Sequence, residues 1–110
     1  MHGRHSLLQV RMLEPALLAL LQAQPEHGYI LTDRLNKFGL GTIDPSIIYR
    51  MLRQMEELGW VTSTWDAQEA LGPPRRIYQL TDDGRQRLAG WRKELTSVEI
   101  LIQNLLKEIE

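Results

Sequence analysis

The feature that most constrains this chain is an apolar stripe near its C-terminus that keeps one regular pattern over about six helical turns. Its members recur at alternating intervals of three and four residues and are Leu88, Trp91, Leu95, Val98, Ile102, Leu105 and Ile109. This spacing is the heptad seam of a coiled coil, and Leu101 and Leu106 widen it. The long C-terminal helix that it predicts needs a cover for its apolar side.

Two covers for this stripe are open, because the helix can pack along its own domain or against a second copy of the chain. The rest of the sequence predicts three short helices and a hairpin, which offer too little surface for about six turns of seam. We therefore expect a homodimer. The expected interface residues are Trp91, Leu95, Val98, Ile102, Leu105 and Ile109.

The composition limits the classes of function that remain. A chain of 110 residues with 43% hydrophobic content can bury one modest core. It has no cysteine, which excludes disulfides, thiolate zinc sites and cysteine nucleophiles and fits a reducing cytoplasm. No apolar run approaches a membrane span or a signal peptide, so we expect a cytoplasmic protein without a membrane partner. The net charge is −1, so a basic surface for nucleic acid has to be local.

Three helices are predicted in the first half of the chain. The first covers Leu7 to Leu21 and is apolar on most of its faces. The second is short, with Ile30, Leu31, Leu35 and Phe38 as its apolar stripe, and ends at Gly39 and Gly41.

The third predicted helix has the clearest limits. Asp44 is a suitable N-cap, Pro45 fits the first helical position, and Gly59 marks the end. Its apolar positions recur at helical intervals and are Ile48, Met51, Leu52, Met55 and Leu58. The opposite side is therefore free to contact a partner.

After Gly59 the pattern changes from helix to strand. Residues 60–65 and 76–80 are rich in aromatic and β-branched side chains, which predicts two strands joined by a hairpin with an extended, polar tip. Thr81 then caps the last helix, and Asp82 and Asp83 in its first turn complement the helix dipole. Three helices followed by a two-stranded hairpin is the order of a winged helix-turn-helix, in which the hairpin is called the wing.

Several short motifs occur in this framework in a fixed order. They are His27-Gly28-Tyr29-Ile30, Ile48-Tyr49 with Leu52, Leu58-Gly59-Trp60-Val61, Pro74-Arg75-Arg76-Ile77-Tyr78 and Leu80-Thr81-Asp82-Asp83-Gly84. Together they resemble the PadR family of transcriptional regulators over roughly residues 13–88. The resemblance implies a mainly α protein with a small β-hairpin, in which residues 1–80 form a winged helix-turn-helix DNA-binding domain and residues 81–110 a C-terminal dimerisation helix.

The same resemblance implies a sequence-specific DNA-binding regulator that acts as a dimeric repressor. It places the chain with the short members of the family, which lack a separate effector domain. The chain departs from the family pattern in the third helix, where Ser46-Ile47-Ile48-Tyr49-Arg50 replaces the usual Gly-Thr before Leu-Tyr-Pro. We expect this departure to change the operator that is recognised.

DNA binding requires cations that reach phosphates and side chains that reach base edges, and arginine can do both. The expected DNA-binding residues are Ser46, Tyr49, Arg50, Arg53, Arg75 and Arg76. For the arginines the alternative is a solvated charge that pairs with Glu56, Glu57 or Asp66. Ser46 can bind a phosphate or support the helix cap, and Tyr49 can bind a phosphate or pack on the wing. The expected partner is double-stranded DNA with an inverted-repeat operator.

A small aromatic effector is a further expectation, because some short relatives bind flat aromatic compounds between paired tryptophans at the dimer centre. Trp91 and Leu95 are the candidate effector-binding residues, although Leu95 stands where the stacking tryptophan of those relatives would be. The alternative is that Trp91 is a core or interface aromatic. The competing function for the whole chain is a winged-helix module that binds protein without binding DNA.

Metal binding and catalysis are not expected. His2, His5 and His27 have no carboxylate at a regular ligand spacing. The sequence contains no Ser-His-Asp order, no phosphate-binding glycine loop and no paired carboxylates in a catalytic setting. We therefore expect no enzyme activity and no cofactor.

Overall fold

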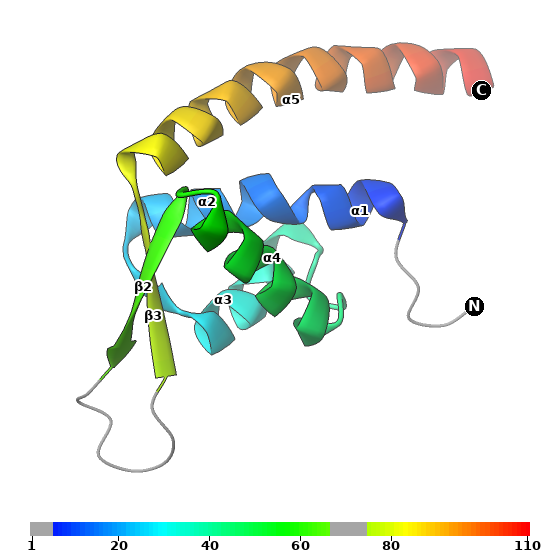
Figure 1. The fold of residues 1–110 in the computed structure, drawn as a ribbon. Helices are drawn as coiled ribbons and strands as arrows, with labels where there is room; N and C mark the ends of the chain where they lie inside the picture. The colour runs from blue at the N-terminus through cyan, green and yellow to red at the C-terminus, as the bar shows by residue number, and fades with distance from the viewer. Residues whose placement is uncertain (1–5, 67–74) are drawn as a thin grey trace.

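The computed structural model describes residues 6–66 and 75–110. Its elements follow one another as α1 (Leu7–Arg11), α2 (Leu13–Ala23), β1 (Glu26–His27), α3 (Gly28–Arg34), the 3₁₀ helix η1 (Leu35–Phe38), α4 (Pro45–Glu57), β2 (Val61–Asp66), β3 (Arg75–Leu80) and α5 (Asp82–Ile109). Figure 1 shows the helices packed beside a small sheet, with α5 running above α1 and α2. The predicted mainly helical fold with a β-hairpin and a long C-terminal helix is confirmed.

The first helix differs from its prediction, because the expected single helix from Leu7 to Leu21 is interrupted at Met12. Pro15 explains the interruption: it has no N–H to donate, and its ring would collide with the carbonyl of Arg11 in a continuous helix. The chain therefore ends α1 at Arg11 and starts α2 at Leu13. In α2 the proline lies in the first turn, where no intrahelical donor is needed.

The second predicted helix is divided into α3 and η1. Leu31 and Leu35 are buried as expected, but Phe38 is 46% exposed and does not belong to the core. A 3₁₀ helix rises about 2.0 Å per residue instead of 1.5 Å, so η1 carries Phe38 past the edge of the core. Gly39 then ends the element with a φ of 82°, a conformation that favours glycine.

The third predicted helix, α4, is confirmed at both ends. The Asp44 side chain accepts a hydrogen bond from the Ser46 N–H, and Pro45 occupies the first helical position. Gly59 follows the helix with a φ of 83°. Ile48, Leu52 and Met55 are buried among the leucines of α2 and α3, whereas Leu58 is exposed although it continues the same spacing.

The two predicted strands form an antiparallel pair in which Val61 lies opposite Leu80 and Asp66 opposite Arg75. A short strand that the sequence did not predict, β1, pairs with the other edge of β3, so the order in the sheet is β1-β3-β2. The predicted polar hairpin tip lies outside the described residues. The sheet holds the C-terminal end of β2 and the N-terminal end of β3 near the N-terminal end of α3.

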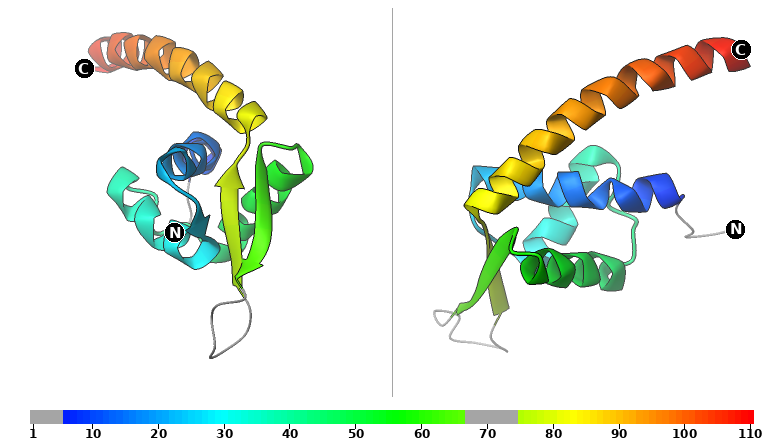
Figure 2. Two further views of the ribbon diagram at one scale, coloured as in Figure 1. Left: turned by 90° about the vertical axis from the view of Figure 1, so that its left-hand side faces the viewer. Right: turned by 45° about the horizontal axis from the view of Figure 1, so that its top comes forward.

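Helix α5 begins at its predicted cap, since the Thr81 hydroxyl accepts a hydrogen bond from the Gly84 N–H. The helix packs against α2, and Leu88 and Trp91 join the edge of the core. Beyond them α5 extends past the rest of the fold, as Figure 2 shows. Its outer turns are exposed, including Ile102 at 48% and Ile109 at 78%. The division into units 1–80 and 81–110 stays a prediction.

No helix in the described ranges combines the length and the apolar character needed to cross a bilayer.

Candidate nucleic-acid interface

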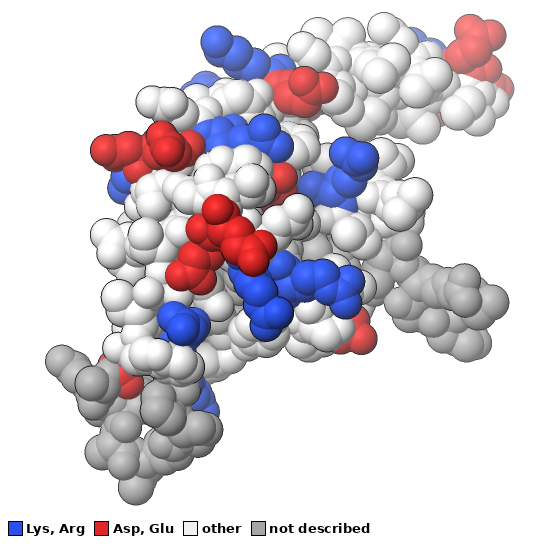
Figure 3. Space-filling view, viewed as in Figure 1, with Lys and Arg blue, Asp and Glu red and all other residues white. Residues whose placement is uncertain are grey.

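The predicted DNA-binding residues come from two elements, α4 and the wing strand β3. The side chains are all exposed and are those of Ser46, Tyr49, Arg50, Arg53, Arg75 and Arg76. In Figure 3 basic side chains gather over α4 and others lie toward the wing, while acidic ones cover the C-terminal end of α4. The basic surface is therefore local, as the small net charge requires.

A pocket of ≈ 480 Å³ connects the helix to the wing. Its lining residues are Gly28, Tyr29, Tyr49, Arg75, Arg76 and Tyr78. At Gly28 a Cβ atom would lie 2.7 Å from Cε1 of Tyr49, closer than a side chain allows. The absence of a side chain at Gly28 thus lets the Tyr49 ring approach the start of α3. Tyr49 lines the pocket together with the wing residues, and its choice between a phosphate contact and packing on the wing stays a prediction.

The two wing arginines are oriented by aromatic rings. The Arg75 guanidinium lies 4.4 Å from the ring centre of Tyr29, and that of Arg76 lies 4.3 Å from the ring centre of Trp65. Tyr29 was not among the predicted site residues, although its place in the His-Gly-Tyr motif was a usable signal.

Arg76 also has polar partners. Its Nη1 donates a 2.8 Å hydrogen bond to Oγ of Ser63, which in turn donates to Oε2 of Glu56 at 2.8 Å. Ser63 thus bridges Arg76 and Glu56, which form no direct ion pair within the described residues. The Glu56 charge, together with burial as the larger cause, raises the pKa of the nearby Tyr78 hydroxyl above its usual 10.0.

The arginines of α4 differ from those of the wing. Within residues 6–66 and 75–110, neither Arg50 nor Arg53 forms an ion pair or a side-chain hydrogen bond. Both are exposed on the side of α4 opposite the buried Ile48 and Leu52. Their charged groups are therefore available to a partner.

Ser46 has a role at the start of α4. Its backbone N–H, and to a smaller extent its hydroxyl, hydrogen-bond to Asp44 and lower the pKa of that carboxyl below its usual value. The geometry thus agrees with the cap-supporting role among the two that the sequence left open. The helix start is held whether or not a phosphate lies beside it.

His27 is tied to the wing. Its Nε2 lies 2.8 Å from Oδ2 of Asp66, and both side chains are mostly buried, so this pair joins β1 to the end of β2. Across the described part of the chain, no three His, Cys, Asp or Glu side chains are grouped to hold a metal ion. His2 and His5 lie outside the described residues.

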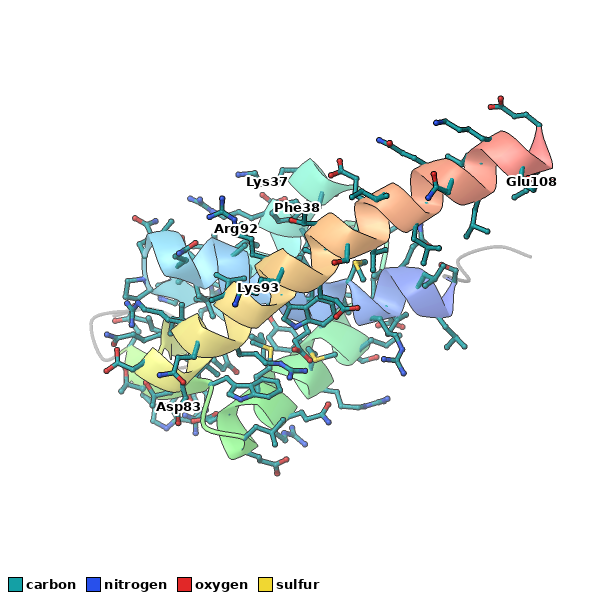
Figure 4. All side chains as sticks on the ribbon, turned by 90° about the horizontal axis from the view of Figure 1, so that it is seen from above. Lys37, Phe38, Asp83, Arg92, Lys93 and Glu108 are labelled. Carbon is teal, nitrogen blue, oxygen red and sulfur yellow. The ribbon has the colours of Figure 1, made fainter. Side chains whose placement is uncertain are left out.

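The predicted dimer seam faces a long open groove between α5 and the helices below it. The groove has a volume of ≈ 1170 Å³, and its apolar lining includes Leu8, Leu40, Leu95, Val98 and Ile102. Phe38 and Arg92, both labelled in Figure 4, also line it. Further along α5, Leu105 and Ile109 continue the exposed seam.

Trp91 lies one helical turn before Leu95, its predicted partner in effector binding, but the two side chains have different surroundings. The Trp91 indole N–H donates a hydrogen bond to Oε2 of Glu14 in α2, and Trp91 is not among the described residues that line the groove. Arg87 Nε donates to the same Glu14 oxygen at 2.6 Å. Sequence reasoning missed Glu14 and Arg87, although a single acid in an otherwise apolar helix was a signal that it needed a partner.

Comparisons with known proteins agree with this arrangement. The model of the Transcriptional regulator PadR-like family matches residues 17–90. The chain is 36% identical over 85 residues to the probable transcriptional regulator Rv1176c of Mycobacterium tuberculosis; the match covers 74% of this chain but 44% of that protein, so the chain spans less than half of its curated relative.

Two crystal structures are informative. A PadR-like transcriptional regulator (BC4206) from Bacillus cereus has a TM-score of 0.79 and 30% identity, with 92% of this chain and 97% of that one covered. Bacillus subtilis PadR in complex with operator DNA has a TM-score of 0.64 and 29% identity, with 73% of this chain and 46% of that one covered.

Proposed function

The chain belongs to the PadR-like family of transcriptional regulators, and from that premise we propose that it is a homodimeric repressor that binds an inverted-repeat DNA operator. The family consists of transcriptional regulators and not of enzymes. The structurally similar Bacillus subtilis PadR was solved with operator DNA, which supports a DNA partner for this chain as well. The proposed site of action is the cytoplasm, in keeping with a family of transcriptional regulators.

The observation that carries the proposal is the pair of uncommitted arginines on α4 next to the oriented arginines of the wing. In a winged helix the third helix enters the major groove and the hairpin follows the backbone. In the proposal Arg50 and Arg53 would contact base edges, since guanidinium groups form bidentate contacts to guanine. Arg75 and Arg76 would contact phosphates, which position the protein without reading sequence.

The homodimer is proposed from the exposed apolar surface of α5. Monomeric proteins rarely expose large contiguous apolar patches. A second copy of α5 would cover it through Leu95, Val98, Ile102, Leu105 and Ile109. The α4 helices of the two protomers, on one face of the duplex, would then read two half-sites. The centres of these half-sites would be about one turn of the DNA helix, or roughly 34 Å, apart.

Repression is proposed because a small dimer on its operator excludes other proteins from that stretch of DNA. Release by a small aromatic effector stays a prediction. The groove beside Leu95 has room for such a molecule, whereas the Trp91 N–H is already bonded to Glu14. Titration of the operator complex with flat aromatic cations and phenolic acids would test release, and unchanged operator affinity throughout would remove the effector from the proposal.

The experiment that tests DNA recognition is selection of bound duplexes from a random pool. We expect an enriched inverted repeat whose affinity falls steeply with salt concentration, because arginines that contact phosphates displace counterions. Enriched sites without two-fold symmetry would contradict the dimeric geometry. Absence of any duplex binding would favour the alternative function, a winged-helix module that binds protein.

A further inference from the structure

The start of α5 is held against the winged-helix domain at one point, where Thr81 and Gly84 contact the backbone of Gly59 and Trp60. The Thr81 hydroxyl donates a 2.7 Å hydrogen bond to the Gly59 carbonyl, and the Thr81 N–H donates to the Trp60 carbonyl at 3.1 Å. At Gly84 an added Cβ atom would lie 2.1 Å from that same Trp60 oxygen. This close approach fixes where α5 begins, but a helix held at one point can still pivot.

A second point of attachment lies about two turns further along α5. There Oε2 of Glu14 accepts hydrogen bonds from Nε of Arg87 and from the Trp91 indole N–H. The Arg87 guanidinium lies 4.4 Å from the ring centre of Trp60 and 6.0 Å from that of Trp91. One carboxylate thus joins α2 to α5 across more than seventy residues of sequence, with Arg87 packed on the same Trp60 that contacts Gly84.

The surroundings of Glu14 favour a fixed geometry. Its side chain is only 15% exposed, so the carboxylate has given up much of its contact with water. A mostly buried charge needs its partners, and here both donors come from α5. Moving α5 away from α2 would leave Glu14 without them, so the ion pair and the indole hydrogen bond resist rotation of α5 about its start.

We infer that Glu14, Arg87 and Trp91 are positioning residues that set the direction of α5 and thereby the distance between the two DNA-reading surfaces of the dimer. The inference rests on the proposed dimeric function. Beyond Trp91 the helix continues for about 27 Å, so a pivot of about 10° there would move its end by about 5 Å. In a dimer joined through the outer half of α5, such a pivot changes the separation of the two α4 helices.

The first test measures the geometry of the dimer without DNA. The chain has no cysteine, so a single spin label at the exposed Gln79 through Gln79→Cys reports the wing-to-wing distance by pulsed dipolar spectroscopy. We expect a narrow distribution in the labelled parent and one broadened by about 5 Å with Glu14→Gln. The matched control is Asp82→Asn. The Asp82 side chain is fully exposed and pairs with Arg85 within α5, so this variant removes a carboxylate that does not join α5 to another element.

The second test measures operator discrimination. Duplexes in which the half-site spacing differs by one or two base pairs are compared with the selected operator and with a single half-site. We expect the parent and Asp82→Asn to discriminate against altered spacing by about tenfold and Glu14→Gln by less than about threefold. Affinity for the single half-site stays unchanged in all three proteins, because the variants do not touch the DNA surface.

Each outcome has one meaning. An unchanged distance distribution and spacing preference in Glu14→Gln overturn the inference, as does a parent without any spacing preference. If Glu14→Gln fails to fold, Trp91→Phe, which removes the N–H donor together with part of the ring, replaces it with the same two criteria. A parent without a dipolar signal overturns the dimer itself, and a parent that binds no half-site overturns DNA recognition.

Discussion

The two halves of α5 share one apolar spacing but have different surroundings. In the first half, Leu88 packs at the edge of the core and Trp91 is hydrogen-bonded to Glu14. In the second half, Ile102 and Leu105 are about half exposed although they occupy equivalent positions of the same seam. One half is held by its own chain, and the other is free to be covered by another molecule.

This difference teaches that periodicity identifies an apolar stripe but not the surface that covers it. Of the two covers considered from the sequence, the chain's own domain covers the first part of the stripe, and a second copy stays a proposal for the rest. The domain covers the stripe as far as α2 extends beside α5. Further along, exposed apolar area remains that contact with water makes costly.

The largest expected effect comes from breaking the free half with Ile102→Glu. A charge buried without a partner in the dimer seam costs several kcal/mol per protomer, so the variant should dissociate or unfold. Sedimentation at micromolar concentration checks this. The control is Ser97→Glu, an exposed position on the other side of α5, which should remain dimeric. A dimeric and folded Ile102→Glu protein would show that the seam is not the interface.

The next effect concerns the held half and uses the two glycines of α5. In Gly84→Ala the new Cβ would meet the Trp60 carbonyl, so the start of α5 must shift, at a cost of about 3 kcal/mol in the free energy of unfolding. At Gly90 nothing lies within 4 Å of an added Cβ, so Gly90→Ala should stabilise the helix by about 0.5–1 kcal/mol. Urea denaturation measures both. Equal effects of the two substitutions would show that the start of α5 is not tightly docked.

How much could be predicted from the sequence follows the same division. The limits of α4 were predictable because Asp44, Pro45 and Gly59 act on the backbone within a few residues of themselves. The interruption at Met12 had a local signal in Pro15 that the apolar pattern outweighed. The strand β1 has only two residues, and its pairing depends on β3, so no local period announces it.

The candidate site shows the same limit. The exposed arginines of α4 were predictable because the apolar positions of that helix determine its outer side. The bond from Arg87 to Glu14 was not, because it joins residues 73 positions apart through a packing arrangement that neither segment encodes alone. The stacking of Arg75 on Tyr29 likewise depends on how the sheet meets α3.

The contrast between held and free side chains recurs on the proposed DNA-binding surface, and the free arginines of α4 provide the next test. Arg50→Ala or Arg53→Ala should change which sequence is preferred, with a loss of about 2 kcal/mol at the base pair that is read if the guanidinium contacts guanine. Binding to variant operators with single base-pair changes measures this. A uniform loss over all sequences would assign these arginines to phosphates instead.

The smallest expected effect concerns the held arginines of the wing. Arg75→Ala and Arg76→Ala should weaken binding to all duplexes similarly, and each should reduce the slope of log affinity against log salt concentration by about one. Among the described residues Arg75 packs on the Tyr29 ring, whereas Arg76 is also linked through Ser63 to the carboxylate of Glu56. Part of the Arg76 charge is therefore already balanced within the protein, and its substitution should cost less affinity than that of Arg75.

A Ser63→Ala variant, which disconnects Arg76 from Glu56 without removing either charge, should leave the salt slope intact. If both arginine variants keep the parent slope, the wing does not contact the phosphates, and recognition depends on α4.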